Sequence, residues 1–160
     1  MIAEPPGIPA DRRRPGPREL PPRPAEIRRP PAARAALAHG AYLLFVGGWP
    51  LVSLRTFAKV TGPKPEGWLA KGVGACLLNV GATLVAAGAR GKVSRELRIL
   101  GAGTGLSFAV MDFYYAGIRR RISPVYLLNG LAQLAFAALW CAAEIKEMNA
   151  VRQPPEPAFA

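Results

Sequence analysis

The sequence predicts an all-α membrane protein, a four-transmembrane-helix bundle that follows a disordered Pro/Arg-rich N-terminal tail. Two observations predict this fold class. Of the 160 residues, 51% are apolar, and they gather in runs of about twenty residues, the length of helix that crosses a hydrocarbon layer of ~30 Å. Most of the 21 Lys and Arg residues lie in the tail and between these runs, where membrane proteins commonly carry them.

The predicted tail covers residues 1–34. It holds ten of the 17 prolines and eight arginines, and it holds no aromatic residue. A segment with so little to bury and so many fixed φ angles is expected to be disordered with polyproline II character. Its arginines offer contacts to anionic lipid headgroups.

The first predicted transmembrane helix covers residues 35–54. Pro50 lies near its end and removes one helical hydrogen bond, so we expect a kink there. A helix that stopped before this proline would be too short to span the bilayer. A basic loop is predicted over residues 55–67, because Pro63 and Pro65 do not continue a helix.

The second predicted helix, residues 68–89, is rich in glycine and alanine. Small residues let helices approach closely in lipid, where packing and hydrogen bonds hold a bundle together. Gly72, Ala75, Asn79 and Ala82 share one face at helical spacing, so this face is predicted to point into the bundle. Asn79 is expected to form a hydrogen bond to another helix.

The last two predicted helices, residues 97–117 and 124–143, form a hairpin. Ser123 and Pro124 open the second of them with a favourable N-cap residue and a proline at a position that needs no N–H. The residues from 144 to 160 turn polar and then proline-rich. They are predicted to leave the membrane as a polar C-terminal tail.

Facing polar stripes are expected to join the helices of this hairpin, at helical spacing on each. The first stripe comprises Gly101, Thr104, Phe108, Asp112 and Tyr115, and the second comprises Tyr126, Asn129, Gln133 and Trp140. A comparable stripe of His39, Tyr42, Val46 and Ser53 lies on the first helix.

Polar side chains inside the apolar runs predict a candidate binding cluster. A carboxylate at membrane depth costs roughly 2.5 to 3.5 kcal/mol on insertion scales, so Asp112 should be compensated or used. Asn129 lies at nearly the same depth in the next helix and is its predicted hydrogen-bond partner. Successive spans alternate in direction, which brings other polar side chains to the same half of the bilayer. The predicted cluster comprises Asp112, Asn129, Tyr115, Gln133, Arg55 and Lys71.

No catalytic residue, metal site or cofactor is predicted. The chain has no Ser, Cys or His constellation typical of nucleophilic catalysis, and its loops are too short to house a catalytic domain. His39 is the only histidine, and neither cysteine has a neighbour at metal-ligand spacing. The net charge of +11 is interpreted as membrane anchoring by basic loops, so the expected partner is membrane lipid and no nucleic acid is expected.

Three functions remain open. The favoured one is a noncatalytic membrane assembly or interaction protein, which associates with itself as a homo-oligomer or with a membrane protein partner through small-residue faces. The second is a carrier or binder of a small lipophilic or cationic molecule, with Asp112 as its counter-charge. The third is an intramembrane lipid-modifying or isomerising enzyme, with Asp112 as its acid or base.

Several short segments carry a resemblance to a known family. They are Trp-Pro-Leu at residues 49–51, Thr-Gly-Pro-Lys at 61–64 and Ile-Ser-Pro-Val-Tyr-Leu at 122–127, with Asp112 between the last two. Over residues 36–143 the chain resembles a family of small bacterial four-helix integral membrane proteins. The resemblance implies the fold, and it implies no activity, because the family has none assigned.

The distribution of positive charge predicts the orientation. The N-terminal tail, the second loop and the C-terminal tail carry 14 Lys and Arg residues, against 7 in the first and third loops. The positive-inside rule then places both termini in the cytoplasm. The predicted localisation is the bacterial inner membrane.

Overall fold

A computed structural model describes residues 29–152, and 85% of these residues are helical with no strand among them. The predicted all-α class is confirmed. In chain order the elements are α1 (Pro31–Val52), α2 (Leu54–Thr61), α3 (Gly67–Ala89), α4 (Arg95–Asp112), the π-helical turn η1 (Phe113–Ile118) and α5 (Val125–Arg152). Within the described residues, α1, α3 and α5 are the helices long and apolar enough to cross a membrane.

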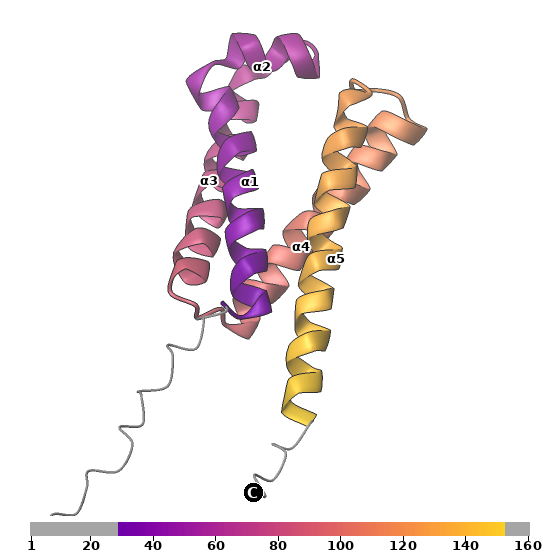
Figure 1. The fold of residues 1–160 in the computed structure, drawn as a ribbon. Helices are drawn as coiled ribbons and strands as arrows, with labels where there is room; N and C mark the ends of the chain where they lie inside the picture. The colour runs from indigo at the N-terminus through magenta and orange to yellow at the C-terminus, as the bar shows by residue number, and fades with distance from the viewer. Residues whose placement is uncertain (1–28, 153–160) are drawn as a thin grey trace, which may run out of the picture.

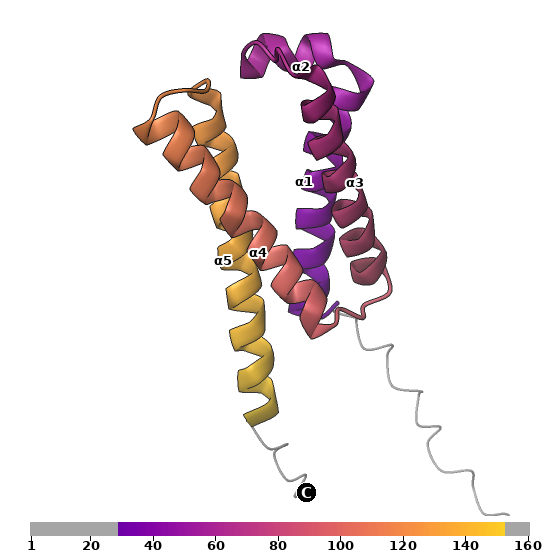
Figure 2. The same ribbon diagram turned by 180° about the vertical axis from the view of Figure 1, so that it is seen from behind.

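The helices form two pairs. α1 packs along α3, and α4 with η1 packs along α5, while α1 also contacts α5 and joins the pairs. Figures 1 and 2 show the two pairs from opposite sides, with α4 leaning across α5. The pairs diverge toward α2 and the link between η1 and α5, and the first residues of α1 lie at the opposite end.

Glycines at seven-residue spacing hold α1 against α3. Gly40 lies against Gly81, Gly47 lies against Gly74, and Ala33 lies against Gly88. A Cβ atom built on Gly40 would stand 2.7 Å from the backbone oxygen of Gly81, a distance that real Cβ atoms essentially never show. The two backbones therefore meet with no side chain between them, and we call these contacts the glycine seam.

The predicted inner face of α3 is wrong. Gly72, Ala75, Asn79 and Ala82 are all exposed, and they face away from α1. The buried face is the one that carries the glycine seam, together with Leu77 and Leu84. This face packs against α1 because glycines spaced seven apart permit a closer backbone approach than alanines do. Dispersion attraction between the two helices grows with that approach.

α1 begins at Pro31, four residues before the predicted start. Proline is tolerated in the first turn, where its missing N–H has no helical partner. Ala32 and Ala33 are 1% and 0% exposed, so the end of the predicted tail belongs to the packed core. The rest of that tail, residues 1–28, and its predicted disorder lie outside the described residues.

A short helix replaces most of the predicted basic loop 55–67. α2 begins after Ser53, whose hydroxyl accepts a hydrogen bond from the Thr56 amide over 3.3 Å. Pro50 lies inside α1 as predicted, and α1 ends at Val52. Phe57 and Val60 follow at helical spacing, and this spacing together with the Ser53 cap indicates a helix. Pro63 and Pro65, which come directly after it, favour the loop that the sequence predicts instead.

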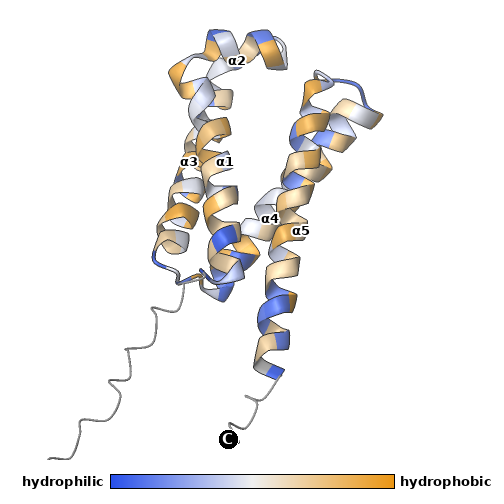
Figure 3. Ribbon diagram, in the orientation of Figure 1, coloured by the Kyte–Doolittle hydropathy of each residue, from blue (hydrophilic) through white to orange (hydrophobic). Residues whose placement is uncertain are grey.

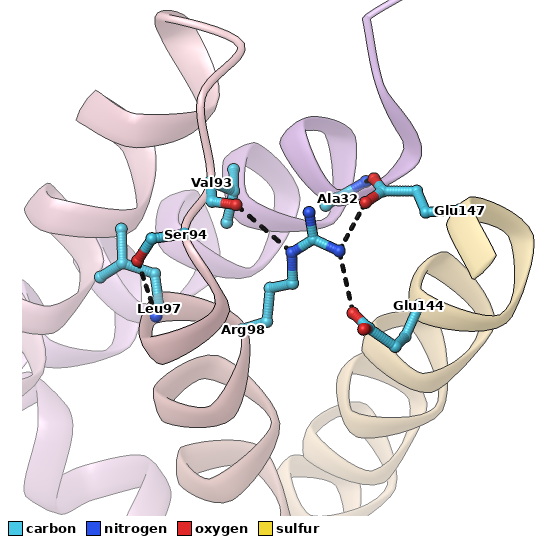
Figure 4. Close-up of polar contacts among 7 residues, drawn as sticks. All are labelled: Ala32, Val93, Ser94, Leu97, Arg98, Glu144 and Glu147. Carbon is cyan, nitrogen blue, oxygen red and sulfur yellow. Dashed lines mark hydrogen bonds and ion pairs between the residues drawn. The ribbon is translucent and has the colours of Figure 1, made fainter. Parts of the chain in front are cut away.

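Arg98 ties three helices together at the end where α1 starts. Its guanidinium pairs with Glu144 over 2.9 Å and with Glu147 over 2.5 Å, and its Nε donates to the Val93 carbonyl. Glu147 also accepts from the backbone N–H of Ala32 over 3.2 Å. Figure 4 shows this cluster between α1, α4 and α5.

These contacts correct the predicted end of the last helix. The sequence predicts that the last helix ends near residue 143, but α5 continues as helix to Arg152. Glu144 and Glu147 lie three residues apart on its exposed last turns, so both reach the same arginine. Figure 3 shows hydrophilic residues gathered in this part of α5, in α2 and in the link before α5, with apolar residues dominating the middle of α1, α3 and α5.

Candidate functional site

A cavity of about 650 Å³ is lined by residues of both helix pairs and of α2. Its walls are mainly apolar and come from α1, α2, α3, α4 and α5. They include Phe45, Trp49, Phe57, Leu69, Val73 and Leu128. Polar side chains also line it, and they comprise Thr61, Lys64, Glu66 and Tyr126 together with Tyr42, Asp112, Asn129 and Gln133. We call the last four the polar floor.

The first hydrogen-bond chain of the polar floor joins α1, α5 and α4. The Tyr42 hydroxyl donates to Oδ1 of Asn129 over 2.6 Å, and Nδ2 of Asn129 donates to Oδ2 of Asp112 over 2.6 Å. The predicted pairing of Asp112 with Asn129 is therefore confirmed. Asp112 is 5% exposed, and the Asn129 amide supplies one of the hydrogen bonds that water would otherwise make to its carboxyl group.

The second chain runs from Trp140 through His39 to Gln133. The indole Nε1 of Trp140 lies 3.1 Å from Nδ1 of His39, and Nε2 of His39 lies 3.1 Å from Oε1 of Gln133. An indole N–H only donates, so Nδ1 must accept. The imidazole is therefore neutral and carries its proton on Nε2, which donates to Gln133.

Phe136 joins the two chains. Its ring stacks on His39 with centroids 4.7 Å apart, and it packs against Tyr42 at 5.1 Å. The aromatic ring fixes both donors at the position where α1 contacts α5. The polar floor is thus held by packing on one side and by hydrogen bonds on the other.

The amide nitrogen of Gln133 has no acceptor among the described residues. Its side chain is 1% exposed, and Nε2 is buried without a partner. Gln133 lines the cavity one helical turn beyond Asn129. A buried donor without an acceptor costs about 1 to 3 kcal/mol, so this atom is a local cost to the stability of the polar floor.

Three residues of the predicted cluster lie elsewhere. Arg55 at the start of α2, Lys71 on α3 and Tyr115 in η1 are exposed and do not line the cavity. Tyr115 packs against Tyr114 instead, with ring centroids 5.0 Å apart. The reason is the π-helical turn that starts directly after Asp112, because its wider turn rotates Tyr115 away and buries Ala116 in its place.

The cation beside the cavity is Lys64, which the prediction did not include. Its Nζ donates to the carbonyls of Thr61 and Gly62 over 3.0 and 3.1 Å. It also lies 5.7 Å from the ring centroid of Phe57 and 5.2 Å from that of Tyr126. Lys64 therefore caps the C-terminal end of α2 and holds α2 against α5.

Three further members of the site were missing from the predicted cluster, namely His39, Tyr42 and Trp140. Their signal was present in the sequence, because His39 and Tyr42 share a stripe on α1 and Trp140 follows Gln133 by seven residues. What the sequence could not give is the packing of α1 against α5, which brings the stripes together.

Within residues 29–152, no three His, Cys, Asp or Glu side chains gather as metal ligands. Comparisons of the chain with protein-family models, with curated proteins and with solved structures gave no match. The resemblance to a bacterial membrane family therefore stays a prediction. Two of the three segments that carry it are neighbours in the fold, since Lys64 lies over Tyr126.

Proposed function

We propose that this protein is a four-span integral membrane protein that binds a lipophilic molecule in the cavity above Asp112. The observation that carries the proposal is the cavity itself, which combines apolar walls with a buried carboxylate. Ligand sites of this size are commonly apolar with a few convergent polar groups.

The direction of the helices supports four spans. α3 ends at the side where α1 begins, and α5 begins at the opposite side. If α3 and α5 both cross the bilayer, the chain between them must cross as well. α4 and η1 supply that crossing with 18 and 6 residues of continuous helix, long enough for a layer of ~30 Å.

Charge supports the orientation that we propose. Arg90, Lys92, Arg95 and Arg98 lie at the end of the bundle where α1 begins, and the Pro/Arg-rich segment precedes it. By the positive-inside rule this end faces the cytoplasm of a bacterial inner membrane, with both termini on that side.

Binding accounts for the cavity better than the other two functions do. A protein that only assembles with itself or with a membrane partner has no need of a buried carboxylate at an apolar cavity. An enzyme would need reactive groups there, but the residues that line the cavity include no Ser, Cys or His, and Lys64 and Thr61 are engaged in hydrogen bonds to backbone carbonyls. Of the two carboxylates on the lining, Glu66 accepts a hydrogen bond from the Trp68 indole, and Asp112 is left as the buried binding group.

Native mass spectrometry of the protein released from lipid nanodiscs tests this function. Ala132→Trp fills the cavity, whereas Ala138→Trp adds the same side chain to the exposed face of α5. We expect retained lipophilic adducts on the wild type and on Ala138→Trp, and their loss from Ala132→Trp. Equal adduct patterns on all three proteins would contradict a binding role for the cavity.

A further inference from the structure

We infer that the ligand of this cavity is a lipophilic organic cation of the quaternary ammonium type, with Asp112 as its counter-charge and aromatic rings as its walls. This inference rests on the proposed function and adds the chemical class of the ligand. Two observations carry it. One is an open oxygen on a carboxylate that has no ion-pair partner, and the other is the aromatic lining beside that carboxylate.

The first step is that a ligand in the cavity can reach Asp112, which lines it and is 5% exposed. Asn129 donates to Oδ2 of Asp112, whereas Oδ1 accepts no hydrogen bond from residues 29–152. Within that range, the fully buried side-chain atom that lacks a partner is Nε2 of Gln133. Oδ1 of Asp112 must therefore keep accessible surface, so it is the oxygen that a ligand can approach.

The second step is the charge on the cavity lining, which carries two carboxylates, Asp112 and Glu66, and the ammonium of Lys64. Glu66 is exposed and accepts from the Trp68 indole, and Lys64 donates to two backbone carbonyls. The ion pairs within residues 29–152 all involve Arg98, so Asp112 is a buried carboxylate without a counter-ion. A water molecule donates a hydrogen bond to such an oxygen but leaves its negative charge in place, whereas a bound cation neutralises it.

The third step is the aromatic character of the walls. Six aromatic side chains line the cavity, namely Tyr42, Phe45, Trp49, Phe57, Phe108 and Tyr126. Phe45, Trp49 and Phe57 pack in a row, with neighbouring ring centroids 5.9 and 5.8 Å apart. Phe108 lies one helical turn before Asp112 on α4. The faces of such rings attract cations, and quaternary ammonium ligands are commonly bound by them.

Lys64 shows that this lining already holds an ammonium group at one edge. Its Nζ lies 5.7 Å from the ring centroid of Phe57 and 5.2 Å from that of Tyr126. The cation–π contacts within residues 29–152 are these two. The other four rings of the lining are therefore left for the charge of a ligand.

The fourth step is the choice of cation. A calcium or magnesium ion takes about six oxygen ligands, and the described residues include no group of three side chains that could hold a metal ion. A primary ammonium carries three N–H donors, each of which needs an acceptor, and the walls are mainly apolar. A quaternary ammonium has no N–H group, so one carboxylate and the ring faces satisfy its charge.

The test titrates N-octylpyridinium into the full chain in nanodiscs of zwitterionic lipid. Pyridinium quenches tryptophan fluorescence on contact, and Trp49 lies on the cavity lining. Trp68 is 72% exposed and reports probe dissolved in the bilayer, which does not saturate, so the saturable part of the quenching measures binding in the cavity. Three compounds with an octyl chain then compete for this part. Octyltrimethylammonium is a cation, octylbenzene is the neutral isostere of the probe, and octyl sulfonate is an anion.

We expect octyltrimethylammonium to displace the probe, and octylbenzene and octyl sulfonate to need at least about tenfold higher concentrations in the membrane. Asp112→Asn keeps the shape of the side chain and the acceptor for Asn129 but removes the charge. It should weaken probe binding at least about tenfold and leave competition by octylbenzene within about twofold. Glu66→Gln is the matched control, since it removes the exposed carboxylate of the same lining, and it should bind the probe within about threefold of the wild type.

A second pair of variants tests the rings. Phe108→Leu keeps an apolar side chain beside Asp112 but removes the aromatic face, so it should weaken the probe relative to octylbenzene by about threefold or more. Phe113→Leu removes a ring of η1 that does not line the cavity, and it should leave that ratio unchanged. An equal ratio in the two variants contradicts a role for the rings in binding charge.

The outcomes separate this inference from the proposed function. Equal competition by octyltrimethylammonium and octylbenzene, or stronger competition by octyl sulfonate, overturns the cationic ligand and leaves a lipophilic binding cavity in place. Asp112→Asn that binds the probe like the wild type, or a larger loss in Glu66→Gln, also overturns it. Quenching that never saturates overturns the cationic ligand as well, and the proposed function fails with it only if Ala132→Trp also retains the lipophilic adducts of the wild type.

Discussion

Asn129 donates to Asp112 across the α4–α5 hairpin, with 2.6 Å between Nδ2 and Oδ2. The two side chains are 17 residues apart in sequence, and each stands in a segment that is otherwise apolar. The loss of stability on removing this hydrogen bond therefore reports whether Asp112 stabilises the fold in addition to its role in binding.

Replacing Asp112 should separate these roles. Asp112→Asn keeps an oxygen that accepts from Asn129, and we expect it to change the free energy of unfolding by less than about 1 kcal/mol. Asp112→Leu leaves the half-buried Asn129 amide without this partner and should destabilise by about 1 to 3 kcal/mol. Unfolding in mild detergent measures both. The double change Asp112→Leu with Asn129→Leu should recover part of the loss, and a single leucine variant as stable as the wild type would argue against a structural role.

The glycine seam predicts that one added methyl group separates α1 from α3. In Gly81→Ala the new Cβ would stand 2.8 Å from the Gly40 carbonyl oxygen, and we expect a loss of about 1 to 3 kcal/mol from the overpacked contact. Gly72→Ala is the matched control, because nothing lies within 4 Å of its Cβ position. It should be neutral or stabilising by up to about 1 kcal/mol, since alanine favours helix over glycine. Similar thermal midpoints for the two variants would show that the seam is looser than described.

Arg98 should contribute a modest, salt-dependent stability. Its side chain is 25% exposed, so Arg98→Met is expected to cost no more than about 1 kcal/mol at low salt. The difference from the wild type should shrink as salt is added, because partly exposed charges are screened. Arg95→Met, an exposed arginine on the same helix, serves as the control. A loss that stays constant across salt concentrations would point to packing of the arginine stem and not to its charge.

His39 is expected to be neutral with its proton on Nε2. Nitrogen NMR of the protein labelled at histidine reports the tautomer directly, and the chain contains one histidine, so the signal needs no assignment. Trp140→Phe removes the donor to Nδ1 and should release the preference between the two nitrogens. A protonated imidazole at neutral pH would contradict the order of donors that ends at Gln133.

Shortened chains should locate the true start of the bundle. A chain that begins at Arg29 keeps all of α1, and we expect it to insert and to unfold like the full protein. A chain that begins at Ala35 loses the buried Ala32 and Ala33 and the bond to Glu147, and it should be less stable by about 1 to 3 kcal/mol. Equal stability of the two would restore the tail boundary that the sequence predicted.

The contact between Asp112 and Asn129 was predictable because a short hairpin fixes both depth and direction. Helical rise and the alternation of spans place the two residues at one level whatever the rest of the bundle does. The same reasoning placed Gln133 on the inner face of α5. These parts of the site depend on local periodicity alone.

The parts that could not be predicted depend on contacts between distant segments or on backbone register. α3 offers two faces of small residues, and periodicity does not say which one meets α1, so Asn79 was placed on the wrong side. The π-helical turn after Asp112 changes the register by a fraction of a turn without any sequence signal as plain as a proline. Tyr115 was misplaced for that reason.

The glycine seam also governs how α1 and α3 find their alignment. Its glycines recur every seven residues, and the helix positions one turn away on α3 are Leu77 and Leu84. Sliding α3 along α1 by one turn would therefore drive a leucine into a space that does not admit even a methyl group. Because the glycines of the seam lack Cβ atoms, α1 and α3 fit together in a single register. The outward faces of both helices can therefore change in sequence without loss of that register.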